Sequence, residues 1–124
     1  MIKTLHTENA PAAIGPYSQA KIVNGILYAS GQIAINPAKG DVETTTIEDQ
    51  TEQVCKNIGA ILEAAGSSFD KVIKTTCFLK NMSDFATFNG IYGTYFTSKP
   101  ARSCVAAAAL PKDVLVEVEI IAEV

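Results

Sequence analysis

The C-terminal segment Val114–Val124 constrains the fold more than any other part of the chain, because its side chains alternate strictly between two classes. One set is entirely apolar: Val114, Val116, Val118, Ile120, Ala122 and Val124. The set between them is mixed: Leu115, Glu117, Glu119, Ile121 and Glu123. Successive side chains of a strand point to opposite faces. The segment is therefore predicted to be a strand with one face in the core and the other against solvent or another subunit.

Further strands are predicted from runs of apolar and β-branched residues. Ser18–Val23 and Ile26–Ser30 flank Asn24-Gly25, a dipeptide suited to a type I′ turn because both of its residues must take positive φ. These runs predict a hairpin. Val72–Lys80 and Ala101–Ala108 complete the predicted sheet. Alternation in Val72–Lys80 places four residues on one face, which makes Cys77 a small core residue: Ile73, Thr75, Cys77 and Leu79.

Two helices are predicted from apolar residues at helical spacing. The first, Thr45–Ala65, has Thr45 and Glu48 at the spacing of a capping box and Gly66 as its stop. The second, Phe85–Phe96, follows Ser83 and Asp84, either of which could be its N-cap. Its apolar stripe is Phe85, Phe88, Tyr92, Tyr95 and Phe96.

Residues 1–124 are predicted to form a single domain in which two helices cover one face of a sheet of about five or six strands. The uncovered face would carry the glutamates between Leu115 and Ile121. Its mixed character suggests a subunit interface that contains a polar pocket. Hydrophobic residues make up 48% of this short chain, which agrees with apolar surface being buried between subunits.

Composition argues against several functional classes. The net charge is −3 and the 10 lysine and arginine residues are not clustered, so a nucleic-acid partner is not expected. No segment reaches the roughly 18–20 apolar residues of a membrane span, and the N-terminus lacks the apolar core of a signal peptide. We expect a protein that binds neither nucleic acid nor membrane and that is cytoplasmic.

The cysteines and the single histidine limit the chemistry further. Cys55, Cys77 and Cys104 are odd in number and widely spaced, which fits neither a disulfide framework nor a zinc site and indicates free thiols in a reducing compartment. A metal site, a Ser/His/Asp triad or a Cys/His pair would depend on His6, and an ordinary surface histidine is the simpler interpretation. No metal site is expected.

Arg102 and Glu117 are the candidate functional residues. Arg102 begins an otherwise uncharged strand and shares a face with Cys104; its guanidinium could clamp a substrate carboxylate. Spacing alone favours the alternative, a structural salt bridge to Glu117 or Glu119. Glu117 lies between two valines, where burial would raise its pKa and a nearby arginine would lower it. Without a histidine beside it, Cys104 is a weak candidate for a nucleophile.

Several motifs, in order along nearly the whole chain, make the sequence resemble the RidA (YjgF) family. Those in the N-terminal half are Ala10-Pro11-Ala12-Ala13-Ile14-Gly15-Pro16-Tyr17-Ser18-Gln19 and Tyr28-Ala29-Ser30-Gly31-Gln32-Ile33. The middle matches at Ala64-Ala65-Gly66, Lys74-Thr75-Thr76 and Asp84-Phe85-Ala86-Thr87. The C-terminal motifs are Pro100-Ala101-Arg102-Ser103-Cys104-Val105, Leu110-Pro111-Lys112-Asp113-Val114 and Val116-Glu117-Val118-Glu119. Each fragment alone would be weak, but together they are specific.

The resemblance implies a chorismate-mutase-like α+β fold with about six strands in a mixed sheet and two helices on one face. It implies a homotrimer with clefts between subunits, the last strand inside the sheet and the Arg102 strand at its edge. The implied activity is hydrolysis of 2-aminoacrylate-type enamines and their imine tautomers to 2-keto acids and ammonia. Such intermediates come from pyridoxal-phosphate-dependent dehydratases, and the deaminase itself uses no cofactor.

The resemblance also implies roles for individual residues. Arg102 would hold the substrate carboxylate, and Glu117 would orient and help deprotonate the attacking water. Four further side chains match cleft positions, with backbone groups offered by Gly31: Tyr17, Ser30, Asn89 and Cys104. For Tyr17 and Asn89 the sequence alone would have indicated a loop aromatic and a solvated helix position.

Two other functions remain as alternatives. A non-catalytic trimer could bind keto acids or related metabolites as a sensor or regulator; it would need Arg102 but not Glu117. A chorismate mutase shares the fold, but its chemistry needs several cationic groups around a dicarboxylate, and Arg102 is the only arginine. The first alternative is the stronger of the two.

Overall fold

The computed structural model describes residues 1–124 and is built around a six-stranded sheet with the order β1-β2-β3-β8-β6-β7. The strands are β1 Lys3–Leu5, β2 Ala20–Val23, β3 Ile26–Ala29, β6 Val72–Leu79, β7 Ala101–Ala106 and β8 Val116–Glu123. Neighbours are antiparallel except for the parallel pair β6 and β7, so the sheet is mixed. Two short strands, β4 Ile35–Asn36 and β5 Asp41–Val42, form a separate antiparallel pair.

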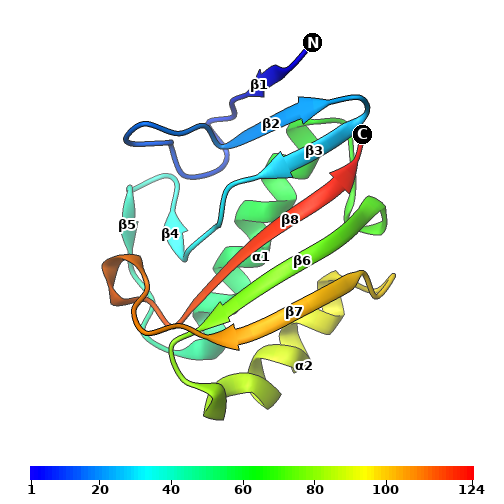
Figure 1. The fold of residues 1–124 in the computed structure, drawn as a ribbon. Coiled ribbons are helices and arrows are strands. Elements are labelled where there is room, and N and C mark those ends of the chain that lie inside the picture. Colours follow the sequence, from blue (N-terminus) through cyan, green and yellow to red (C-terminus); the bar gives the residue numbers. More distant parts are fainter.

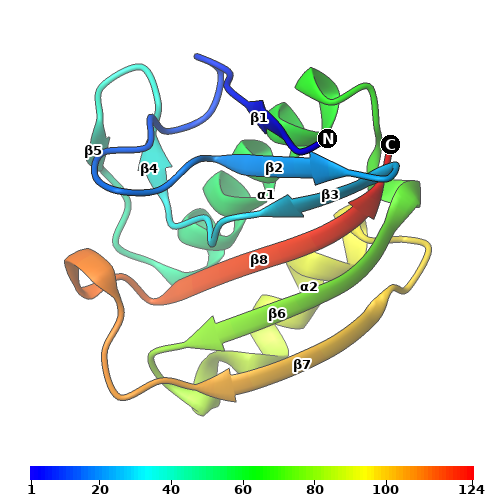
Figure 2. The ribbon, with the colours of Figure 1, turned by 45° about the horizontal axis from the view of Figure 1, so that its top comes forward.

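Both helices pack on the same face of this sheet, as Figures 1 and 2 show from two directions. They are α1 Ile47–Ala64 and α2 Phe85–Tyr95, and short 3₁₀ turns lie at Phe69–Lys71, Met82–Asp84 and Pro111–Asp113. The predicted α+β arrangement of two helices on one face is confirmed. Neither helix has the length and apolar character needed to cross a membrane.

The predicted hairpin is present. β2 and β3 pair directly through Asn24-Gly25, whose φ angles are 52° and 78°. Both central residues thus adopt the positive φ that a type I′ turn requires. The hairpin places Ser30 and Gly31 directly after β3, where the chain runs on beside β8 through a bridge between Gln32 and Val118.

The N-cap of helix α1 lies one residue later than the sequence suggested. Its N-cap is Thr46, whose Oγ1 accepts a hydrogen bond from the Asp49 backbone N–H over 3.2 Å. The predicted pair Thr45 and Glu48 is therefore wrong by one residue, because neighbouring threonines offer equivalent spacing to an acidic residue. Gly66 ends the helix with a φ of 73°, as predicted.

Strand β6 departs from strict alternation at its start. A shift in the pairing with β8 between Val72 and Lys74 turns Ile73 outward, where it is 47% exposed. The prediction that Ile73 shares the buried face is therefore wrong, because the extra residue of a bulge reverses the side-chain direction. Beyond the bulge, Thr75, Cys77 and Leu79 are fully buried, which confirms Cys77 as a core residue.

The prediction for the last strand is confirmed. β8 lies inside the sheet between β3 and β6. Val116, Val118, Ile120 and Ala122 are buried in the main core, Val114 is buried just before the strand, and Val124 is partly buried. The opposite face of β8 is not covered by a helix and exposes Glu119 and Glu123. β7, with Arg102, is the edge strand.

Candidate functional site

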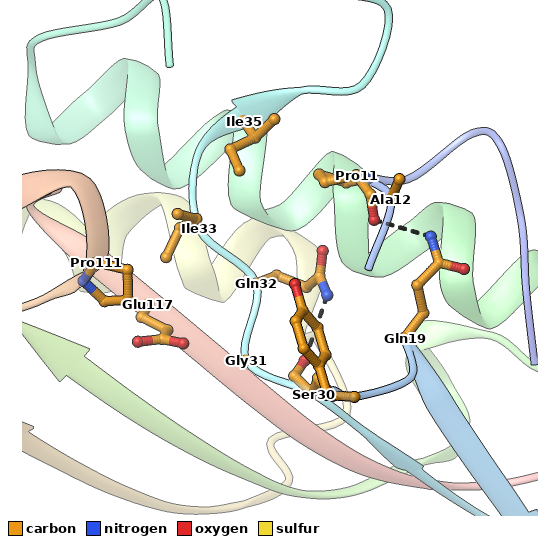
Figure 3. Close-up of a pocket in the computed structure, with 11 residues that line it drawn as sticks. Pro11, Ala12, Gln19, Ser30, Gly31, Gln32, Ile33, Ile35, Pro111 and Glu117 are labelled. Atoms are coloured by element: carbon orange, nitrogen blue, oxygen red, sulfur yellow. Dashed lines mark hydrogen bonds between the residues drawn. The ribbon is translucent and has the colours of Figure 1, made fainter. Parts of the chain in front are cut away.

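Glu117 lies in a pocket of about 400 Å³ between the start of β8 and two loops. One loop runs from Pro11 to Tyr17 and the other from Ser30 to Ile35; Figure 3 shows Glu117 and Pro111 on one side of the pocket and Pro11, Ala12 and Gln19 on the other. The lining residues are Pro11, Ala12, Tyr17, Gln19, Ser30, Gly31, Gln32, Ile33, Ile35, Pro111 and Glu117.

The Glu117 carboxylate packs directly against Gly31. A Cβ added at Gly31 would overlap the carboxylate, with the carboxyl carbon only 2.9 Å away. Only glycine lets the chain after β3 approach so closely. Burial raises the pKa of Glu117, and the negative charge of Glu119 raises it further. A half-buried carboxyl group with a raised pKa is suited to exchanging protons with a bound molecule.

The N-terminal wall of this pocket is held by Gln19, which is 2% exposed. Its Nε2 donates to the carbonyl oxygens of Thr7 and Pro11, each over 2.9 Å, and its Oε1 accepts from the Thr7 N–H over 2.7 Å. One buried amide therefore fixes the loop whose far end carries Tyr17. Tyr17 itself is 54% exposed at the pocket mouth.

Ser30 has a structural bond of its own. Its hydroxyl donates to the Ser18 carbonyl over 2.6 Å, which ties the end of β3 to the segment before β2. Ser30 also lines the pocket, so the hydroxyl oxygen can still accept a hydrogen bond from a bound molecule.

Arg102 lies in a second pocket of about 460 Å³ between β7 and the C-terminal half of α2. Its Nη1 donates to Asn89 Oδ1 over 2.6 Å. Its guanidinium carbon is 4.9 Å from the centre of the Tyr92 ring and 5.4 Å from that of Phe85. Asn89 thus acts here as a partner of Arg102. The lining residues are Asn89, Tyr92, Gly93, Phe96, Thr97, Lys99, Pro100 and Arg102.

Arg102 and Glu117 project from opposite faces of the sheet. Arg102 pairs with Thr75, which is fully buried beneath the helices, whereas Glu117 pairs with Phe78. Paired residues share a face and successive residues alternate, so Thr75 and Phe78 point to opposite sides. The prediction of a structural salt bridge from Arg102 to Glu117 or Glu119 is therefore wrong. Arg102 forms no ion pair within the chain.

Cys104 is partly buried on the Arg102 face and pairs with the buried Cys77. Burial raises the pKa of the Cys104 thiol, although Arg102 opposes the shift. The thiol therefore remains protonated near neutral pH, which argues against a nucleophilic role. No three histidine, cysteine, aspartate or glutamate side chains gather where they could hold a metal ion.

Sequence reasoning missed two residues that build these pockets. Gln19 belongs to a recognisable motif, but the hydrogen bonds of its side chain to Thr7, Ala10 and Pro11 are not visible in the sequence. Tyr92 was assigned to the apolar stripe of α2 and is indeed buried, yet the face of its ring meets Arg102. An aromatic residue three positions after Asn89, on the same helix face, was the available signal.

A mixed six-stranded sheet with two helices on one face defines an α+β protein, and the half-buried Glu117 lines a pocket beside the uncovered face of that sheet. A family model described as Endoribonuclease L-PSP matches residues 7–124. The chain belongs to this family, the RidA/YjgF family.

Similar proteins carry different functional names. A putative regulator AldR from Lactococcus lactis is 62% identical over 124 residues, which cover 99% of this chain and 98% of that protein. The 2-iminobutanoate/2-iminopropanoate deaminase of Escherichia coli is 48% identical over 126 residues, with 98% of each chain covered. The crystal structure of Escherichia coli TdcF with bound serine has a TM-score of 0.93, 40% identity and 98% coverage of both chains.

Proposed function

We propose that this protein is an enamine/imine deaminase that hydrolyses 2-aminoacrylate-type intermediates to 2-keto acids and ammonia. The observation that carries the proposal is a half-buried carboxyl group, Glu117, whose pKa is raised by burial, in a pocket of small-metabolite size. The substrate carboxylate needs a cation, and no lysine or arginine lines that pocket. Arg102 supplies the cation if two subunits share the site.

A site between subunits resolves the separation of the two residues. Glu117 lies next to the uncovered sheet face, and Arg102 lies at the sheet edge on the opposite face. A cleft where the edge of one subunit meets the uncovered face of the next joins them without changing either pocket. We propose a homotrimer, in which such a head-to-tail contact closes into a ring. Asn89 and Cys104 would come from the Arg102 side, and Tyr17, Ser30 and Gly31 from the Glu117 side.

The reaction then needs positioning and one acid–base group. Arg102 pairs with the substrate carboxylate and fixes the C=N carbon near Glu117. The enamine reacts as its iminium tautomer, formed when its terminal carbon takes up a proton from water. Water adds to the iminium carbon as its proton passes to the Glu117 carboxylate, giving a neutral carbinolamine. Glu117 returns that proton to nitrogen, and the C–N bond breaks as the hydroxyl proton moves to Glu117, which then passes it to the departing ammonia. The products are the 2-keto acid and ammonia.

The name of the AldR relative favours a second candidate, a regulator that binds a small metabolite without converting it. The serine bound by TdcF is also a small molecule with a carboxylate. Both functions would use Arg102, but only hydrolysis gives Glu117 a role. The family description names RNA cleavage; a pocket lined by Glu117 and by no lysine or arginine disfavours a phosphodiester ligand there.

The test is to generate 2-aminoacrylate or 2-aminocrotonate in situ and to follow keto-acid release. We expect acceleration by the wild-type protein, none by Arg102→Ala, and a loss of at least about 100-fold with Glu117→Gln. The Gln variant keeps the shape of the side chain and removes its charge and its proton exchange. Binding of 2-oxobutanoate, measured by calorimetry, should be lost in Arg102→Ala and kept in Glu117→Gln.

Two outcomes would reject the deaminase. Absence of acceleration by the wild-type protein, together with binding of the keto acid, would identify a metabolite-binding regulator. Full activity of Glu117→Gln would remove the acid–base role on which the mechanism depends. Ser103→Ala, on the same strand as Arg102 but facing the other way, is the matched control.

A further inference from the structure

We propose that Tyr92 is a positioning residue that holds the Arg102 guanidinium ready to receive the carboxylate of the substrate. The inference rests on the proposed function, because it assigns to Arg102 the carboxylate-binding role. It concerns a residue that touches Arg102 rather than the reacting atoms. The geometry comes from three elements, β6, β7 and α2, which meet beside the second pocket.

One residue from each of these three elements contacts the other two. Thr75 on β6 is the register partner of Arg102 on β7. Thr75 Oγ1 lies 2.7 Å from the Tyr92 hydroxyl on α2, and the Tyr92 ring lies 4.9 Å beneath the Arg102 guanidinium carbon. The residue directly opposite the arginine thus fixes the ring on which the arginine rests.

The Tyr92 ring is held in one orientation. It is 7% exposed and packs against Phe96 at 4.3 Å between ring centres and against Phe88 at 5.4 Å. Its hydroxyl bond to the fully buried Thr75 adds to this packing, which by itself holds the ring in place. A ring fixed in this way presents a constant electron-rich face to the cation above it.

Arg102 needs such support because its side chain is exposed on an edge strand. A free arginine samples many rotamers, and binding a ligand with it requires that freedom to be lost. The Tyr92 and Phe85 rings and the neutral amide of Asn89 restrict the guanidinium before any ligand arrives.

The contacts with the two rings and with Asn89 also leave Arg102 able to bind a carboxylate. A carboxylate from the same chain would neutralise the charge and occupy the N–H donors that the substrate needs. Aromatic faces attract the cation without accepting its in-plane N–H groups, and Asn89 takes one bond from Nη1. Charge and a two-donor edge of the guanidinium therefore remain available for a bidentate pair with a carboxylate.

The experiment compares Tyr92→Phe, Tyr92→Leu and a variant with difluorophenylalanine at the same position. Phenylalanine keeps the ring face, leucine removes it, and fluorination weakens its negative potential at nearly constant shape. We expect KM for 2-aminocrotonate, and Kd for 2-oxobutanoate, to rise about 3- to 10-fold with leucine. The fluorinated variant should lie between leucine and phenylalanine, and kcat should change little in all three.

A second readout does not depend on activity. Arg102 is the only arginine in the chain, so its guanidinium N–H signals are unambiguous in the NMR spectrum of uniformly ¹⁵N-labelled protein. Above ring faces these protons should be shifted upfield and their rotation slowed. Tyr92→Phe should keep the shift, whereas Tyr92→Leu should lose most of it.

Tyr95→Leu is the matched control, since Tyr95 is a partly buried tyrosine on the same helix that packs on Phe69 rather than on Arg102. An equal loss of affinity in Tyr95→Leu and Tyr92→Leu would overturn the proposal, as would an unshifted Arg102 signal in the wild type. If the wild type accelerates no deamination, the proposed function fails. The Arg102 signals then decide by themselves whether Tyr92 positions the guanidinium.

Discussion

Glu117 carries its carboxyl group where burial and a neighbouring like charge both favour the protonated form. A general base must be ionised to accept a proton, so the raised pKa brings the group closer to the pH at which it both accepts and returns one. Its position depends on Gly31, whose missing side chain leaves the space that the carboxylate occupies. The proton affinity of Glu117 is thus set by burial and by one neighbouring charge, and its position by the absence of a side chain at Gly31.

The contribution of the neighbouring charge predicts a pH effect. Glu119 raises the pKa of Glu117, so Glu119→Gln should lower it. Activity requires the carboxylate and falls as the pH drops through the pKa of Glu117. The acid limb of kcat/KM for Glu119→Gln should therefore move to lower pH than in the wild type. A limb that stays in place, measured from pH 4 to 8, would mean that another group controls it.

The contact between Gly31 and Glu117 predicts that substitution of Gly31 lowers both the activity and the stability of the protein. In Gly31→Ala the new methyl group displaces the carboxylate, and we expect deamination to fall about 10- to 100-fold. Because the displaced atoms are the far end of a flexible side chain, the free energy of unfolding should fall by no more than about 1 kcal/mol. In a Glu117→Ala background the same substitution should cost clearly less in urea unfolding. Equal costs in both backgrounds would show that Gly31 serves the backbone rather than Glu117.

At the scale of elements, the start of α1 shows how tertiary context selects between equivalent local signals. Thr45 and Thr46 each precede an acidic residue by three positions. Only Thr46 has the extended φ and ψ of a cap, −102° and 152°, and bonds the Asp49 N–H. The buried Ile47 begins the apolar face of the helix, and this fixes the residue before it as the cap.

This assignment predicts unequal effects of two neighbouring substitutions. Thr46→Ala should lower the free energy of unfolding by about 1 kcal/mol, because a helix N–H loses its acceptor. Thr45→Ala, exposed and outside the helix, should change it by less than about 0.5 kcal/mol. Urea unfolding of both variants measures the difference; a larger loss at Thr45 would restore the cap expected from the sequence.

At the scale of the whole molecule, one chain places the Arg102 guanidinium and the Glu117 carboxyl group on opposite faces of the sheet. The proposed site is complete only between two copies of the chain. If two subunits share the site, activity depends on assembly, because a single subunit offers a bound substrate either Arg102 or Glu117 but not both. The uncovered face also exposes Tyr28 and Val105, 47% and 48%, which a neighbouring subunit would cover.

Sharing predicts complementation between two inactive variants. Arg102→Ala supplies intact Glu117 pockets, and Glu117→Gln supplies intact Arg102 pockets. When the two are unfolded together, mixed equally and refolded, about a quarter of the sites should pair both wild-type residues. Deamination should recover to about a quarter of the wild-type rate. No recovery in oligomers shown to be mixed by mass spectrometry would place both residues in one subunit.

The sequence by itself determined the features that depend on local periodicity. The two faces of β8, the turn at Asn24-Gly25 and the two amphipathic helices follow from patterns within single elements, because side-chain direction has a fixed period in strands and helices. The resemblance to the family added that the last strand lies inside the sheet with the Arg102 strand at its edge, and it supplied the expected roles of the cleft residues. Arg102 and Glu117 were already candidates from the strand pattern.

Tertiary structure alone decided how these elements face one another. Alternation tells which residues of one strand share a face, but not which face of the next strand they meet, and a bulge such as that at Ile73 reverses the pattern. The opposite projection of Arg102 and Glu117, the contact of Gly31 with Glu117, and the Tyr92 ring beneath Arg102 all depend on pairing between distant segments. Such pairings are set by packing of the whole core, which no local pattern encodes.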